Sequence, residues 1–185
     1  MIMDIFLKNG VPEKTIYAIQ KAQRSRNNDN PDLLAQIKDA ESLGYKIDKK
    51  DINDFFNQDL EPLLKGPVKE ILEKLVKDGH KLFLFTKGVE YFQRSKIRRS
   101  GIEEYFDENI YVFDSNKEET DVDIDQHEKT FFINDHADEI EDFAKAHPKV
   151  KFIYVKGPKT SHDRFIKHKH IPTIDDISSL SKYIK

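Results

Sequence analysis

The chain has no cysteine and no tryptophan among its 185 residues. Without cysteine it can form no disulfide bond, no thiolate metal site and no cysteine nucleophile. It also has no run approaching the roughly 20 apolar residues that cross a bilayer. Residues 1–7 are apolar but too few for the hydrophobic part of a signal peptide. These absences predict a soluble, cytoplasmic protein with no membrane partner.

The chain also lacks an excess of charge of either sign. Its 31 Lys and Arg residues nearly balance 34 Asp and Glu residues, for a formal net charge of −3. Proteins that bind polyanions usually carry a basic excess or a basic patch. We therefore predict no nucleic-acid partner.

Alternating strand and helix patterns dominate the chain after residue 66. Short apolar runs rich in aromatic and β-branched residues predict strands. These runs are residues 81–86, 109–113, 130–134 and 150–155. A helical pattern at 68–78 precedes the first run, helical patterns at 88–99 and 136–146 separate later ones, and a last helix is expected at about 174–184. This alternation is typical of βαβ units and a mainly parallel sheet.

The first third of the chain has a different pattern. Residues 2–8 form a short apolar run that we interpret as a strand. Residues 11–62 show no strand pattern and three helical stretches, the last at about 49–58. We therefore predict a helical insertion after the first strand.

Two of the predicted strands end in polar side chains. Thr86 follows one strand, and Asn134 and Asp135 follow another. Ligands of open α/β sheets bind beyond the carboxyl ends of the strands, so these side chains predict one shared crevice. Two simpler interpretations remain open. A threonine at a strand end can make only a local hydrogen bond, and acidic residues are common where a helix begins.

These strand ends resemble two motifs of the haloacid dehalogenase (HAD) superfamily. Residues 82–88 are similar to its second motif, and residues 131–140 are similar to its fourth. The resemblance extends over about residues 63–185. It implies an α/β protein with a HAD-like, Rossmann-type three-layer α/β/α core and a mainly parallel sheet. Residues 1–10 and 63–185 would form this core, and residues 11–62 would form a small helical cap.

The resemblance also implies a phosphate-binding site. The second motif of the family ends in a threonine or serine whose hydroxyl and backbone N–H hold a phosphoryl group. Thr86 stands at that position and Lys87 follows it. The family also uses a lysine to neutralise the phosphate. Lys117 is the best match to that lysine, and Lys96 is the competing candidate.

The fourth motif implies a metal site. Acidic residues at this point bind Mg²⁺ in the family. Asp135 aligns with the first of these acids, and Glu139 stands where the second usually lies. A hard cation held by one or two carboxylates normally needs a substrate phosphate to complete its shell. Mg²⁺ is therefore only a weak expectation.

The first motif of the family is not matched. The family has Asp-x-Asp-Gly-Thr here, with the first Asp as nucleophile and the second as general acid/base. In the equivalent stretch Leu7 replaces the nucleophile and Asn9 replaces the acid/base. A register that makes Asp4 the nucleophile puts Phe6 at the acid position. Leucine cannot attack phosphorus, and asparagine cannot exchange a proton at neutral pH.

Three functional hypotheses follow. The first is a HAD-like protein that lacks standard phosphatase catalysis and binds a small phosphorylated ligand or a protein partner. The second is an active Mg²⁺-dependent phosphohydrolase with a divergent first motif or another nucleophile. The third is a purely structural domain that binds a protein and gives no response to phosphate and Mg²⁺.

Overall fold

The computed structural model describes most of the chain: residues 2–26, 30, 32–64, 66–113, 129–156 and 171–184. It divides into two compact units. Unit 1 comprises Met1–Leu64 and Lys81–Ser115, and unit 2 comprises Lys65–His80 and Asn116–Lys185. Within the described ranges, no helix has both the length and the apolar character needed to cross a membrane.

Unit 1 begins with a helix, α1 (Ile2–Lys8), so the strand predicted for residues 2–8 is wrong. A short apolar run does not by itself distinguish a strand from a helix. The burial pattern follows the helical repeat here. Ile5 and Phe6 are buried, and Ile2 packs against the same cluster from one turn earlier. Leu7 points away from this face and is 46% exposed.

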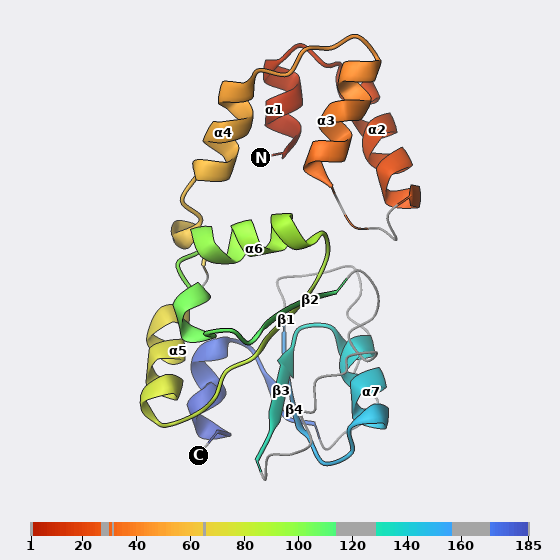
Figure 1. The fold of residues 1–185 in the computed structure, drawn as a ribbon. Helices are drawn as coiled ribbons and strands as arrows, with labels where there is room; N and C mark the ends of the chain where they lie inside the picture. The colour runs from red at the N-terminus through yellow and green to blue at the C-terminus, as the bar shows by residue number, and fades with distance from the viewer. Residues whose placement is uncertain are drawn as a thin grey trace. The chain divides into compact units, whose positions relative to one another are not determined.

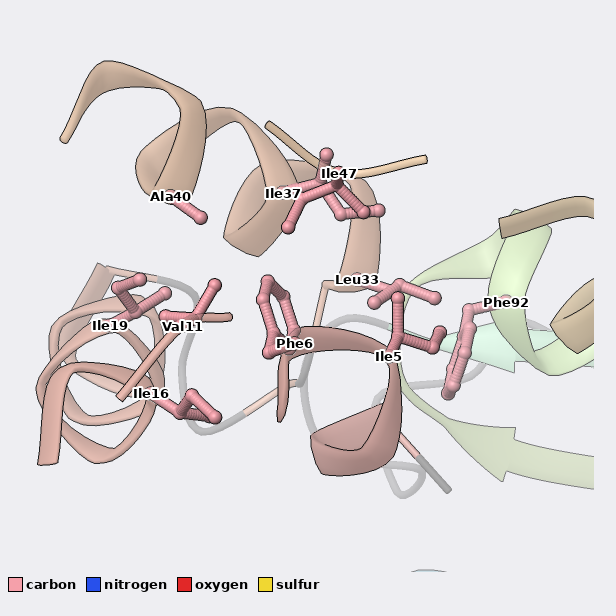
Figure 2. Close-up of a cluster of buried hydrophobic side chains, with 10 residues drawn as sticks. All are labelled: Ile5, Phe6, Val11, Ile16, Ile19, Leu33, Ile37, Ala40, Ile47 and Phe92. Atoms are coloured by element: carbon pink, nitrogen blue, oxygen red, sulfur yellow. The ribbon is translucent and has the colours of Figure 1, made fainter. Parts of the chain in front are cut away.

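Three further helices follow in unit 1, as predicted for residues 11–62. They are α2 (Glu13–Arg26), α3 (Leu33–Ser42) and α4 (Lys49–Asn57), followed by the short 3₁₀ helix η1 (Glu61–Leu63). Their apolar faces enclose one buried cluster, with Phe6 in its middle (Figure 2). Phe6 has no exposed surface, and Phe92 extends the cluster to a later helix. These helices are therefore held together by a core of their own.

The rest of unit 1 is a βαβ unit. Strand β1 (Leu84–Lys87) leads into α6 (Glu90–Arg99), and the 3₁₀ helix η2 (Glu103–Tyr105) precedes β2 (Ile110–Phe113). The two strands pair in parallel, with Thr86 opposite Val112. The predicted strand–helix–strand order is confirmed here, although β1 begins and ends later than expected.

Aromatic rings line one face of this two-stranded sheet. Phe85 stacks on Tyr111 with ring centroids 5.3 Å apart and on Phe113 at 5.9 Å. Phe83 continues the ladder, 6.4 Å from Tyr111. Alternate residues of a strand share a face, so this arrangement follows directly from the spacing of the aromatic residues.

Unit 2 contains a three-stranded parallel sheet. Its elements are α5 (Val68–Lys77), β3 (Phe131–Asn134), α7 (Ala137–Ala146), β4 (Lys151–Val155), β5 (Thr173–Ile174) and the 3₁₀ helix η4 (Ile177–Lys182). The strand order is β3-β4-β5. The single helix predicted for 174–184 is wrong in detail, because Ile174 belongs to β5 and only Ile177–Lys182 form a helix, which is of the 3₁₀ type.

Both faces of this sheet are covered. Phe132 stacks on Phe143 of α7 with ring centroids 4.2 Å apart, and α7 lies beside β3 and β4 (Figure 1). On the other face, Ile153 packs with Ile174 and with Leu180 of η4. A parallel sheet buried on both faces explains why its strands read as nearly continuous apolar runs.

The single sheet that we expected is present as two sheets in the described residues. Strand β1 pairs only with β2, and β3 pairs only with β4. The run that we expected to join the sheet, residues 2–8, is helical. Each of β1 and β3 therefore has one edge without a strand partner among the described residues. The division into a core of 1–10 and 63–185 and a cap of 11–62 stays a prediction.

Candidate functional site

The carboxyl end of β1 carries Thr86 and Lys87. Thr86 is half-buried and Lys87 is exposed. The Thr86 hydroxyl makes no hydrogen bond to any residue that the structure describes. It is therefore not engaged in the local contact that the simpler interpretation requires.

The turn after β1 is fixed by close packing. Gly88 has a φ of 145°, and a Cβ atom there would lie 2.3 Å from Nε2 of Gln93. That Nε2 atom donates to the Lys87 carbonyl oxygen at 2.7 Å. The Gly88 N–H donates to the carbonyl oxygen of Phe113 at 2.8 Å. These bonds hold the strand end and the start of α6 in one geometry.

Helix α6 begins two residues after this turn. Its N-cap residue, Val89, offers no side-chain hydrogen bond to the first turn. The N–H groups of an uncapped first turn, together with the helix dipole, favour an anion. Glu90 carries a negative charge in the same turn, but Arg94 binds its carboxylate at 3.0 Å. Thr86, Lys87 and the N-terminus of α6 thus all belong to the end of β1 and the turn that follows it.

The carboxyl end of β3 carries Asn134 and Asp135. The Asn134 side chain bridges two groups: Nδ2 donates to Oε2 of Glu139 at 2.7 Å, and Oδ1 accepts from the His136 N–H at 3.1 Å. Asp135 is exposed. Asn134 therefore holds the predicted metal-binding glutamate in place, a role that we did not assign from the sequence. An asparagine two residues before a predicted helix start is the signal that could have indicated it.

The described residues do not form a Mg²⁺ site on their own. Asp135 and Glu139 both lie at the end of β3, but Asn134 already occupies one oxygen of Glu139. Among the described residues no group of three or more His, Asp or Glu side chains is placed to hold a metal ion. Mg²⁺ prefers a full octahedral shell, so these two carboxylates would have to be supplemented by water and ligand phosphate.

Asn9 has a structural role. Its Nδ2 donates to the Ile5 carbonyl oxygen at 2.8 Å and to Oδ2 of Asp51 at 2.9 Å. Its Oδ1 accepts from the N–H of Asp48, the N-cap residue of α4, at 2.9 Å. These bonds join the end of α1 to the start of α4. Because residues 2–8 are not a strand, the match of Leu7 and Asn9 to the carboxylate positions of the family stays unconfirmed.

Asp51 completes this junction. Its carboxylate accepts hydrogen bonds from Lys8 and from Asn9, and its side chain is 11% exposed. The Lys8 hydrogen bond lowers the pKa of Asp51, and the Asn9 bond adds to the effect. Both bonds favour the charged carboxylate.

The predicted site residues fall in different parts of the structure. Thr86 and Lys87 are neighbours in unit 1, and Asp135 and Glu139 are neighbours in unit 2. Lys117 lies outside the described residues.

The competing lysine, Lys96, lies on α6 of unit 1, with its ammonium 5.5 Å from the centre of the Phe92 ring. Burial lowers its pKa, and the charge of Arg99 lowers it further. This placement gives Lys96 a packing role against an apolar ring.

Comparison with known proteins identifies the fold. No family model matches the sequence, and no curated protein matches it. A crystal structure from Burkholderia xenovorans, assigned to the haloacid dehalogenase-like hydrolases, superposes with a TM-score of 0.75 at 13% identity. The match covers 100% of this chain and 89% of that one. This chain therefore has a HAD-like α/β fold with parallel strands.

Proposed function

We propose that this chain binds the phosphate group of a small ligand at the carboxyl end of β1 and lacks standard HAD phosphatase catalysis. The observation that carries the proposal is the Thr86 hydroxyl, which is half-buried at a strand end, has no partner among the described residues, and precedes Lys87. The HAD-like fold supports the location, because ligands of open α/β sheets bind at the carboxyl ends of strands.

The recognition chemistry is that of a phosphate dianion. The Thr86 hydroxyl donates one hydrogen bond, the Lys87 ammonium supplies a point charge, and the first-turn N–H groups of α6 face the same end of β1. Hydrogen bonds to a charged group contribute about 1.5–3 kcal/mol each. Three such bonds at the upper end of this range give about 9 kcal/mol, which corresponds to sub-millimolar to millimolar binding once an association cost of about 4 kcal/mol is subtracted.

The absence of standard catalysis is supported by the strand ends. The family places two carboxylates, one residue apart, after a strand. No strand of the described residues is followed by that pattern: β3 is followed by Asp135 and His136, and β5 by Asp175 and Asp176. Asp175 binds Lys156 at 2.6 Å, and Asp176 caps η4 through Ser178. The carboxylates of Asp175 and Asp176 therefore make structural contacts.

The test is a thermal-shift titration with inorganic phosphate and a panel of phosphorylated metabolites. A ligand that binds only the native state raises stability by about 2.7 kcal/mol at a hundred times its Kd. We expect Thr86→Ser, which keeps the hydroxyl, to retain the shift, and Thr86→Val, which keeps the shape, to lose most of it. An equal shift in the valine variant contradicts the proposal. Repeating the titration with Mg²⁺ shows whether the cation strengthens phosphate binding.

A second candidate is an active phosphohydrolase whose nucleophile comes from outside the described residues. The edge of β1 that has no strand partner among the described residues favours it, because an extended segment can add a strand there and bring a carboxylate beside Thr86. The same edge could also serve a protein partner. Mg²⁺-dependent hydrolysis of p-nitrophenyl phosphate that is abolished by Asp135→Asn would establish the enzyme. No hydrolysis above that of the Asp135→Asn variant leaves the binding proposal in place.

A further inference from the structure

A pocket of about 600 Å³ lies in unit 2. It is bounded by the first residues of β3 and β4, the end of α7 and the residues just before β5. Apolar and aromatic side chains dominate its lining, which includes Phe131, Ala144, Pro148, Phe152, Pro172 and Tyr183. Pockets of 300–1,000 Å³ with mostly apolar walls and a few polar groups are typical of small-molecule sites.

This pocket is separate from the strand ends discussed above. Phe131 begins β3 and Asn134 ends it, so the pocket and the Asn134–Asp135 end are roughly 10 Å apart along the strand at about 3.3 Å per residue. The inference therefore does not rest on the proposed phosphate site.

Two lysines line the pocket, and among the described residues only one of them has a carboxylate partner. Of its two lysines, Lys145 is neutralised by Asp142 at 2.7 Å. Lys151 has no carboxylate partner among the described residues, and its ammonium lies 5.5 Å from the centre of the Phe131 ring. Tyr183 adds a hydroxyl on a side chain that is 40% exposed. A single cation beside an apolar wall favours a ligand with one negative charge.

The walls also restrict the body of the ligand. Phe131, Phe152 and Tyr183 present aromatic rings, and Pro148 and Pro172 present flat apolar faces. Such walls gain most from a planar aromatic molecule, which buries a large area with few rotatable bonds. A polyanion such as a nucleotide carries several negative charges, whereas the described part of the pocket offers one cation to balance them.

We propose that this pocket binds a small aromatic monoanion, a carboxylate or sulfonate, with the charge near Lys151 and the ring system between the aromatic and proline walls. The anionic head pairs with the Lys151 ammonium and accepts a hydrogen bond from the Tyr183 hydroxyl. The aromatic body is buried against the apolar and proline walls of the pocket.

The test uses a fluorescent aromatic sulfonate, 8-anilinonaphthalene-1-sulfonate, and a neutral analogue, N-phenyl-1-naphthylamine, with the full chain. We expect Lys151→Gln to weaken binding of the sulfonate about fivefold, the effect of one partly exposed ion pair, and to leave the neutral probe unchanged. Lys149→Gln is the matched control, because Lys149 is an exposed lysine two residues away that does not line the pocket. This control should bind both probes like the parent protein.

A second variant tests the location. Ala144 lines the pocket from α7, and leucine keeps the helix while filling the space. We expect Ala144→Leu to weaken both probes more than tenfold without lowering the melting temperature. No saturable binding to the parent protein overturns the proposal. Equal loss of sulfonate binding in both lysine variants, equal loss of both probes in Lys151→Gln, or unchanged binding in Ala144→Leu would do so too.

Discussion

At the scale of single residues, hydrogen bonds distinguish side chains that hold the structure together from side chains that are available to bind a ligand. Asn9 uses both its amide nitrogen and its carbonyl oxygen within unit 1. Thr86 makes no side-chain hydrogen bond to a described residue. Both residues stand at motif positions in the resemblance to the family, and of the two only the Thr86 hydroxyl has no partner among the described residues.

Asn9→Ala is expected to lower the free energy of unfolding by about 2–3 kcal/mol, because it removes three hydrogen bonds and leaves the Asp48 N–H without its acceptor. Leu7→Ala, at a side chain that is 46% exposed, should cost less than about 1 kcal/mol. Urea unfolding followed by circular dichroism measures both. Similar small losses in the two variants would show that the α1–α4 junction does not depend on Asn9.

At the scale of elements, α6 is tied to the start of α3 by Tyr91. Its hydroxyl donates to Oδ1 of Asp32 at 2.8 Å and accepts from the Leu34 N–H at 3.1 Å. The same Asp32 oxygen accepts from the Ala35 N–H at 3.0 Å and so caps α3. One tyrosine thus connects the helical part of unit 1 to its βαβ part.

This junction predicts a change of stability at alkaline pH. Burial raises the pKa of Tyr91 to about 12 from its ordinary value near 10. Because the folded-state pKa is the higher one, the contribution of Tyr91 is complete below about pH 10 and is lost as the pH rises towards 12. Tyr91→Phe should remove this part of the decline.

Two measurements check it. Absorbance at 295 nm should show that Tyr91→Phe loses the tyrosine that ionises last. Unfolding free energies between pH 10 and 12 should fall more steeply in the parent protein than in the variant. Parallel declines would mean that another group carries the alkaline sensitivity.

The elements also show what the sequence could predict. Strands β2, β3 and β4 and helices α2 to α7 could be predicted from the spacing of their apolar residues and from the Gly and Pro residues near their ends. Each of these patterns is long enough to indicate one type of element. Residues 2–8 could not be assigned from periodicity, since an apolar run of this length suits either element. The choice between helix and strand depends on the cluster in which Phe6 is buried. That cluster includes Leu33 and Ile37, which are distant from Phe6 in the sequence. The partners of Asn9 and Asn134 depend on the same tertiary contacts.

At the scale of the whole molecule, each unit has a hydrophobic cluster of its own. Phe6 lies at 0% exposure in the cluster of unit 1, and Phe143 lies at 1% exposure under the sheet of unit 2. Separate clusters predict separate cooperative unfolding.

Phe6→Ala should cost about 3–5 kcal/mol and reduce amide hydrogen-exchange protection in α1 to α3 while β3 and β4 stay protected. Phe143→Ala should produce the reverse pattern. Hydrogen exchange followed by mass spectrometry resolves the two segments. Loss of protection throughout the chain in both variants would show that the units unfold as one.

One edge of β1 has no strand partner among the described residues, and this edge bears on self-association. An open edge beside Phe83 and Phe85 is the kind of segment that templates intermolecular β-sheets. Lysines flank it at both ends: the Lys81 ammonium lies 5.0 Å from the centre of the Phe83 ring, and Lys87 is exposed. Charged gatekeepers in these positions oppose stacking of one chain on another. By this argument, the lysine that is proposed to attract phosphate would also oppose aggregation at this strand.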